Sequence, residues 1–196
     1  MKILLVGDTP CKALWDYYEE GKLNDYDLIL SSGDLPAEYL SFLVTFSRGP
    51  VLYVHGNHDD NYDQIPPEGC ICIDDRIYVH QGIRILGLGG CYPYKNGKHM
   101  YTEQQMQRRI LRLKYQLMIH HGFDILLTHA PAFALGDGED LVHQGYKSFL
   151  KLLDKYSPRY MVHGHMHLQY DQSLQRITQY KHTQIINAYE RYTWEY

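Results

Sequence analysis

The sequence predicts an α/β fold, and two observations lead to that prediction. Five short aliphatic runs are bounded by glycine and polar residues, a pattern typical of buried strands. Each run also ends in a side chain that can bind a metal ion, and loops at one edge of a sheet are where α/β folds assemble their sites. These end positions are Asp8, Asp34, Asn57 to Asp59, His129, and His165 with His167.

The first half of the chain predicts strands that alternate with helices. Thr9 fits the N-cap of the first helix, and Pro10 fits its first turn, where an N–H group would be unpaired in any case. Gly82 fits a turn between two later strands. The expected elements are strand 3–7, helix 10–20, strand 27–32, helix 36–46, strand 51–54, and strands 70–73, 77–80 and 83–88.

The second half predicts a longer helix over 102–120, which begins at a capping box formed by Thr102 and Gln105. Its buried stripe would comprise Met106, Ile110, Leu113 and Leu117. Its solvated polar face would carry Arg108, Arg109 and Arg112. The remaining expected elements are strand 124–128, a helix that buries Phe149, Leu152, Leu153 and Tyr156 and ends before Pro158, strand 160–163, and strands near 168–171, 174–180 and 183–189.

Length and composition predict one domain, residues 1–196, in a reducing, cytoplasmic setting. A chain of this size buries about 70% of the surface that its unfolded form exposes. The net charge of −4 gives no electrostatic reason to expect nonspecific nucleic-acid binding. We expect no membrane span, because no apolar stretch reaches about 18 residues, and no signal peptide, because the chain enters a strand directly. The four cysteines lack the spacing of a zinc or redox motif.

Each motif taken alone has an ordinary structural explanation. A strand followed by Gly-Asp is usually a turn, and the Gly-Asn-His-Asp segment at 56–59 could be one as well. The two imidazoles of His165 and His167 are harder to explain in this way, because they offer closely spaced metal ligands. It is the ordered combination of five such elements that indicates a site. Carboxylates, an amide and imidazoles without thiolates suit Mn, Fe, Zn or Mg better than a structural zinc site.

The order Asp, Gly-Asp, Gly-Asn-His-Asp, His and Gly-His-x-His resembles the calcineurin-like metallophosphoesterase superfamily from residue 3 to about 190. The motifs 56–59 and 164–167 make the resemblance specific. It implies a four-layer α/β/β/α sandwich of two mixed sheets flanked by helices, with a two-metal centre at the strand ends. One position departs from the family pattern, because the first motif should read Asp-x-His and Pro10 stands where the histidine is expected.

The resemblance implies two divalent cations, Mn foremost, with Fe, Zn, Ni or Mg as alternatives. Asp34 would bridge them, since a carboxylate can hold two cations about 3.5–4 Å apart. The cations would clamp phosphoryl oxygens and convert a bridging water to hydroxide for in-line attack. One site would comprise Asp8, Asp34 and His167, and the other Asp34, Asn57, His129 and His165. Without a histidine at position 10, we expect the first site to be the weaker one, and Cys11 is a possible but soft replacement ligand.

The resemblance also places His58 beside the leaving group, with Asp59 orienting its ring. A positioned imidazolium would assist the departing alkoxide, a role worth roughly 10²–10⁴-fold. Asn57, His58, Tyr92 and His143 are candidate substrate contacts. The loop 87–101 that contains Tyr92 is equally compatible with a plain surface loop.

Two functions therefore stay open at this point. One is an enzyme that hydrolyses a small-molecule or nucleotide phosphomonoester or phosphodiester with a divalent metal. The other is a catalytically silent binding or scaffold protein that keeps the fold, an alternative to which Pro10 gives some weight. The sequence does not choose between monoester and diester, and it does not specify an oligomeric partner. The tail 192–196 could pack on the core or on a second subunit.

Overall fold

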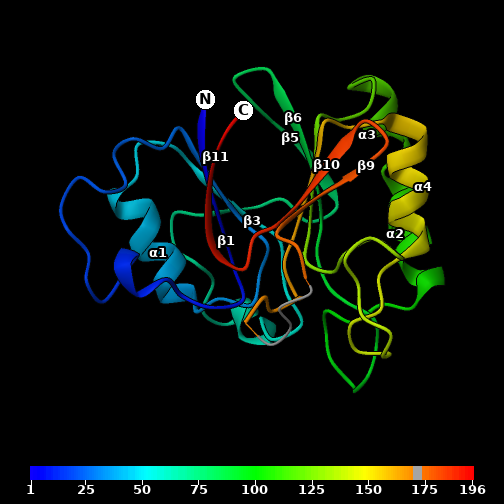
Figure 1. Cartoon of the computed structure of the whole chain (residues 1–196), viewed down its shortest axis with the longest axis horizontal. Coiled ribbons are helices and arrows are strands. Elements are labelled where there is room, and N and C mark those ends of the chain that lie inside the picture. The colour runs from blue at the N-terminus through cyan, green and yellow to red at the C-terminus, as the bar shows by residue number, and fades with distance from the viewer. Residues whose placement is uncertain (170–173) are drawn as a thin grey trace.

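The computed structural model describes residues 1–169 and 174–196, and its strands form two mixed sheets. The first sheet has the order β11-β1-β2-β3-β4, with β1 to β4 parallel and β11 antiparallel to β1. Both chain ends lie together at one edge of the molecule (Figure 1) because of this β1–β11 pairing. The strands span Lys2–Gly7 (β1), Leu28–Ser31 (β2), Val51–Tyr53 (β3), Ile71–Cys72 (β4) and Glu190–Glu195 (β11).

The second sheet has the order β5-β6-β7-β8-β10-β9. Its four inner strands are parallel to one another, while β5 and β9 are antiparallel edges. The parallel strands therefore end at one edge of the sheet, where loops carry side chains into a common region. The strands span Arg76–His80 (β5), Ile83–Leu88 (β6), Ile125–Thr128 (β7), Tyr160–His163 (β8), Ile177–Tyr180 (β9) and Thr183–Asn187 (β10).

Alternation of side chains along the strands builds the layers. On β1, Ile3 and Leu5 face a core between the two sheets, whereas Leu4 and Val6 face the core beneath α1 (Ala37–Phe46). On the second sheet, Leu126 packs outward against the other helices. Figure 1 shows α1 on one flank and α2, α3 and α4 on the other. The predicted four-layer α/β/β/α arrangement is confirmed.

The long helix expected over 102–120 consists of two helices, α2 (Glu103–Arg112) and α3 (Lys114–Ile119). The capping box of Thr102 and Gln105 is present as predicted. At Leu113 the N–H group bonds to the carbonyls of Ile110 and Leu111, which tightens the turn between the helices. The helix with the buried Phe149 face is α4 (Lys147–Tyr156), which ends before Pro158 as expected.

The prediction for Arg109 was wrong. Its side chain is buried instead of solvated, and its Nε donates to Asp75 at 2.9 Å while Nη1 donates to the Gly89 carbonyl at 2.7 Å. Its guanidinium also stacks on the Tyr101 ring at 4.2 Å. A charged side chain is buried only where such partners satisfy it. These partners come from distant segments, so the helical pattern alone did not reveal them.

The helix predicted over 10–20 was also wrong. Only a 3-10 turn, Lys12–Leu14, forms there, and Thr9 does not cap it, because the turn begins after an extended Cys11. Trp15 packs on Tyr39 at 5.2 Å, and Tyr18 packs edge-on against Phe42 at 5.2 Å. These aromatic contacts attach the segment to α1 as an irregular cover, and tertiary packing overrides the local helical signal.

In the C-terminal part of the chain, two of the expected strands form, and the tail adds a strand that was not expected. The strands expected at 174–180 and 183–189 are present as the shorter β9 and β10. For the strand expected near 168–171, residues 168 and 169 lie in a turn and the rest fall outside the described residues. The tail forms β11, where Trp194 packs on Tyr160 at 4.4 Å. Within the described residues, no helix has the length and apolar character that crossing a bilayer requires.

Candidate metal centre

Three of the strand-end side chains sit on strained backbone. Asp8 after β1, Asp34 after β2 and His165 after β8 have φ angles of 64°, 56° and 67°. Residues other than glycine rarely adopt this left-handed conformation, and such strain tends to cluster at functional sites. The three residues line one cavity at the ends of the strands.

Two glycines of the motifs allow the loops to approach each other closely. A Cβ atom at Gly56 would lie 2.0 Å from Oδ1 of Asp34, and one at Gly164 would lie 2.8 Å from Oδ2 of Asp8. Any side chain at these positions would displace a carboxylate. The glycines are therefore needed where the backbone passes the site.

Asp34, His129 and His165 form the centre of the cluster, with ligand atoms all within 4.8 Å of one another. The buried His129 holds its Nδ1 2.8 Å from the Ser32 carbonyl, which can only accept, so Nδ1 carries the proton. Its Nε2 then faces Oδ1 of Asn57 at 2.9 Å and Oδ2 of Asp34 at 3.4 Å. Three lone pairs meet in a buried place, an arrangement that a bound cation would satisfy.

The two central histidines differ in protonation, and in the absence of a cation the protonated form of His129 is favoured. Burial opposes charge on His129, but the negative charges of Asp34 and Asp8 outweigh it and raise its pKa. His165 holds Nε2 2.8 Å from the Val142 carbonyl, so Nδ1 is left as the lone-pair nitrogen. Burial lowers the pKa of His165 to about 3, which keeps its imidazole neutral, the form that binds metals.

Asp8 and His167 lie close to each other in the same cavity. Oδ1 of Asp8 accepts the backbone N–H of His165 at 2.8 Å, and Nε2 of His167 lies 3.9 Å from it. Oδ2 of Asp8 is buried with no hydrogen-bond partner among the described residues. Burial raises the pKa of Asp8 to about 7, and the charge of Asp34 adds to the effect. A buried carboxylate oxygen without a hydrogen-bond partner fits a binding site for a metal ion.

Backbone hydrogen bonds connect both Asp59 and His58 to Asp34. Oδ2 of Asp59 accepts the backbone N–H groups of Gly56 at 2.7 Å and Asp34 at 2.9 Å. Burial raises the pKa of Asp59 to about 6. The backbone N–H of His58 donates to Oδ1 of Asp34 at 2.7 Å, while its side chain is exposed. Asp59 thus ties two loops together through backbone groups, and its role in orienting the His58 ring stays a prediction.

A cavity of about 440 Å³ opens over the cluster. His143 lines it and lies 5.4 Å, ring to ring, from His165, with Nδ1 bound to Asp140 at 2.9 Å. Tyr92, a predicted substrate contact, instead stacks on Tyr146 at 4.7 Å and reaches Glu103. The residues that line the cavity are Asp8, Asp34, Asn57, His58, Tyr94, Val142, His143, His165 and His167.

Tyr94 belongs to the aromatic loop from which substrate contacts were expected, and it touches a candidate ligand. The Asn57 amide nitrogen donates to the Tyr94 hydroxyl at 3.1 Å. This bond turns the amide so that its oxygen faces His129, and so fixes the orientation that a cation would need. The only signal in the sequence was the aromatic-rich loop after β6. Cys11, the possible replacement ligand, is buried in the core beneath α1.

A second cluster of ionisable groups lies beside the first. Nδ1 of His55 is 2.6 Å from Oδ2 of Asp74, and Nη2 of Arg109 is 3.7 Å from Oδ1, which also accepts the Gly89 N–H at 2.6 Å. Burial opposes ionisation of Asp74, but the His55 hydrogen bond and the Arg109 charge outweigh it and lower its pKa. This cluster, which we call the Asp74 network, anchors the loop that carries Asn57.

Comparison with known proteins places the chain in a family. The family model described as "Calcineurin-like phosphoesterase" matches residues 1–169. One solved structure resembles the chain with a TM-score of 0.70 at 12% identity, covering 98% of this chain and 93% of its own. The structure of TT1561 from Thermus thermophilus does so with a TM-score of 0.59 at 14% identity, covering 96% and 89%.

A third structure, described as GAP50, the anchor in the inner membrane complex of Plasmodium, has a TM-score of 0.56 at 13% identity and covers 95% of this chain and 70% of its own. Identities this low establish the fold alone. The comparison with curated proteins gives no significant match. Because the family model covers most of its length, the chain belongs to the calcineurin-like phosphoesterase family.

Proposed function

We propose that this protein is a metal-dependent phosphoesterase that hydrolyses a phosphomonoester or phosphodiester. The observation that carries the proposal is the meeting of Asp34, His129 and His165, whose ligand atoms all lie within 4.8 Å of one another. Membership of a family of metal-dependent phosphoesterases supports it. No comparable observation favours a silent scaffold, because the candidate ligands gather at one place instead of dispersing.

The candidate ligands divide into two groups that share Asp34. Asn57, His129 and His165 would hold one cation, and Asp8 with His167 would hold the other. When bound, two divalent cations, Mn foremost, would neutralise phosphoryl oxygens and make water nucleophilic near neutral pH. Asn57 contributes a neutral oxygen, which limits negative charge beside an anionic substrate.

His58 is the proposed general acid. Its backbone is tied to Asp34 at 2.7 Å, and its exposed ring borders the cavity, so the ring can reach a leaving group without being a ligand. It would donate a proton to the departing alkoxide. We propose that Asp59 positions His58 through the backbone of residues 34 and 56, which it holds directly.

The cavity favours a small-molecule or nucleotide ester as substrate. Its volume, about 440 Å³, suits a small ligand. Lysine and arginine are absent from the residues that line it, so the bound cations and the histidines would provide the positive charge. We propose His143 and Tyr94 as the substrate contacts at its mouth, alongside Asn57 and His58. Tyr92 points elsewhere and is not proposed for this role.

The test is hydrolysis of p-nitrophenyl phosphate and bis-p-nitrophenyl phosphate with added Mn²⁺, compared across Mn, Fe, Zn, Mg and Ni. Asn57→Ala should reduce both activity and metal binding. His58→Ala should keep the calorimetric metal titration while turnover with a poor leaving group falls roughly 10²–10⁴-fold. Unchanged turnover in His58→Ala would remove that residue from the mechanism. If the metal-loaded protein hydrolyses no phosphoester, the proposed phosphoesterase activity is refuted.

A further inference from the structure

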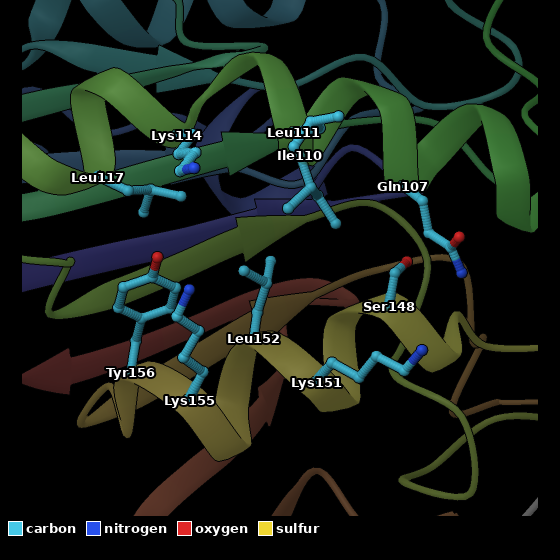
Figure 2. A pocket seen from close by; sticks show the side chains of 10 residues that line it. All are labelled: Gln107, Ile110, Leu111, Lys114, Leu117, Ser148, Lys151, Leu152, Lys155 and Tyr156. Atoms are coloured by element: carbon cyan, nitrogen blue, oxygen red, sulfur yellow. The ribbon is translucent and has the colours of Figure 1, made fainter.

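A groove separates α4 from α2 and α3 on the outer face of the second sheet, and it shares no lining residue with the cavity over the metal centre. It encloses about 330 Å³. Figure 2 shows Ile110 and Leu117 pointing toward α4, while Leu152 and Tyr156 point back at them. The floor is therefore apolar and belongs to two helical segments that do not close over it.

Lysines surround this apolar floor. Lys114 borders the groove on α3, and Lys151 and Lys155 border it on α4 (Figure 2). No carboxylate is among the lining residues, and the ion pairs found in the described part of the chain do not include these three lysines. The positive charge at the groove is thus not neutralised by the protein itself.

The charge of the whole helical layer is opposite to that of the chain. α2, α3 and α4 together carry seven basic and two acidic side chains, whereas the whole chain carries 19 basic and 23 acidic ones. Of these groups, Arg109 is buried and paired with Asp75, and Asp154 binds Lys181, which leaves six basic side chains and one acidic one. A partner for this face should therefore be acidic, because opposite charges steer and orient association.

The apolar surface continues beyond the groove. Leu111, Tyr115 and Met118 recur at helical spacing along α2 and α3, and each exposes more than half of its surface. The buried hydroxyl of Ser148, which also lines the groove, has no hydrogen-bond partner within the described residues.

We propose that this groove is a docking site for an acidic amphipathic helix of a partner protein. Its apolar side chains would enter between α2–α3 and α4, and its carboxylates would meet Lys114, Lys151 and Lys155. With ten residues, α4 is about 15 Å long, which matches about three turns of such a helix. A concave floor with lysines on both banks favours an inserted helix over a membrane surface, which would need the apolar groups to project.

The test uses a fluorescein-labelled peptide of about 14 residues, long enough for anchors at every third or fourth position, with leucines on one face and glutamates elsewhere. Binding is followed by fluorescence anisotropy at physiological salt. Lys151→Glu/Lys155→Glu should weaken binding by about tenfold or more, equivalent to about 1.4 kcal/mol. Lys12→Glu/Arg48→Glu changes net charge equally near α1 and should leave binding within about twofold, because screening removes distant charges. Hydrolysis of a small phosphoester should not change in either variant.

A peptide with its leucines replaced by glutamine should bind about tenfold more weakly, because it lacks the apolar anchors. If that peptide binds as tightly as the leucine-containing one, charge alone explains the binding, and the proposal is overturned. Equal loss in both charge-reversal variants would do the same. Binding only to vesicles of phosphatidylglycerol and phosphatidylcholine would overturn it in favour of a membrane, and self-association abolished by Leu111→Asp would overturn it in favour of a second copy of the chain. Because these measurements do not use the metal centre, their failure and that of the phosphoesterase proposal are distinguishable.

Discussion

The metal centre and the Asp74 network are neighbouring clusters of buried carboxylates and histidines. They differ in how the charge of the buried carboxylate is compensated. Asp74 is surrounded by donors, with His55 at 2.6 Å and the Gly89 N–H at 2.6 Å. Asp8 keeps a buried oxygen without a hydrogen-bond partner among the described residues. The Asp74 network therefore satisfies its buried carboxylate internally, whereas the metal centre leaves a carboxylate oxygen of Asp8 unsatisfied.

This difference is visible in the pKa shifts of the two buried carboxylates, Asp74 and Asp8. In the Asp74 network the pair stays charged, because the pKa of Asp74 is lowered and that of His55 is raised to about 10 against the effect of burial. The pKa of Asp8 moves the other way because burial and Asp34 both penalise its charge. Substitutions in the two clusters should therefore have opposite effects on the metal-free protein.

The largest effect is expected for Asp34→Asn. Asparagine keeps the size and tolerates the left-handed backbone but removes the shared charge. Turnover should fall by about three orders of magnitude, because cation charge supplies several kcal/mol of transition-state stabilisation. The increase in Tm on addition of Mn²⁺ should also disappear. Asp16→Asn, an exposed carboxylate, is the matched control, and retention of the Mn²⁺-induced shift by Asp34→Asn would separate Asp34 from the metal site.

The sharpest test of the Asp74 network is Arg109→Met. Removal of one partner of a buried ion pair should lower the free energy of unfolding by about 3–5 kcal/mol. The measurement is urea denaturation with chelator present, so that metal does not contribute. The exposed neighbour, in Arg108→Met, should change stability little. If the two variants are equally stable, Asp74 does not depend on Arg109 for its neutralisation.

The pH dependence of the metal-free protein should come partly from Asp8. Between about pH 4 and 7 the folded state retains a proton that the unfolded chain has lost, since the pKa is raised from 3.8 to about 7. Stability therefore falls as the pH rises through this range. Asp8→Asn should be more stable than the natural chain by about 4 kcal/mol at about pH 8 and equally stable near pH 4. With Mn²⁺ present the order at the higher pH should reverse. Parallel stability curves with chelator would contradict the assignment.

Within the metal centre, the cation held by Asp8, Asp34 and His167 should be the weaker of two, because Pro10 provides no imidazole. Calorimetric titration should resolve two affinities at least about tenfold apart, a difference typical of losing one supporting group. His167→Ala should abolish the weaker event and leave the tighter one. Two equal affinities would show that proline at position 10 does not weaken metal binding.

The smallest effect is expected for Tyr94→Phe. The variant loses the hydrogen bond that orients the Asn57 amide, worth about 1 kcal/mol or a fewfold in Mn²⁺ affinity. Tyr92→Phe, two residues away and turned toward Glu103, is the control. Equal affinity of the two variants would leave Tyr94 without a positioning role.

The sequence allowed prediction of those parts of the molecule that depend on short-range patterns. Apolar runs identified the central strands, and the Gly56 and Gly164 motifs located the loops of the cluster. The segment after Asp8 could not be predicted, because Trp15 and Tyr18 are held by α1. β11 was missed because its partner β1 lies at the other end of the chain, with Lys2 opposite Glu195.

Predictions for single residues failed for the same reason, because the residues that they contact are distant in the sequence. Arg109 has an ordinary helical environment in sequence, and only the fold brings Asp74 and Asp75 to it. Tyr92 and Tyr94 belong to one aromatic-rich loop, yet one packs on Tyr146 while the other reaches Asn57. Which side of a loop faces a cavity depends on backbone geometry that no pattern in this chain encodes.

The left-handed backbone at Asp8, Asp34 and His165 limits how this site could be re-engineered. A longer carboxylate, such as glutamate, would retain the charge but lacks the short side chain that makes this conformation tolerable. Asparagine and glycine are the replacements that the main chain accepts most readily, and both discard an ionic ligand. Attempts to retune metal preference in the laboratory should therefore begin with Asn57, His129 or His167, whose backbone does not impose this restriction.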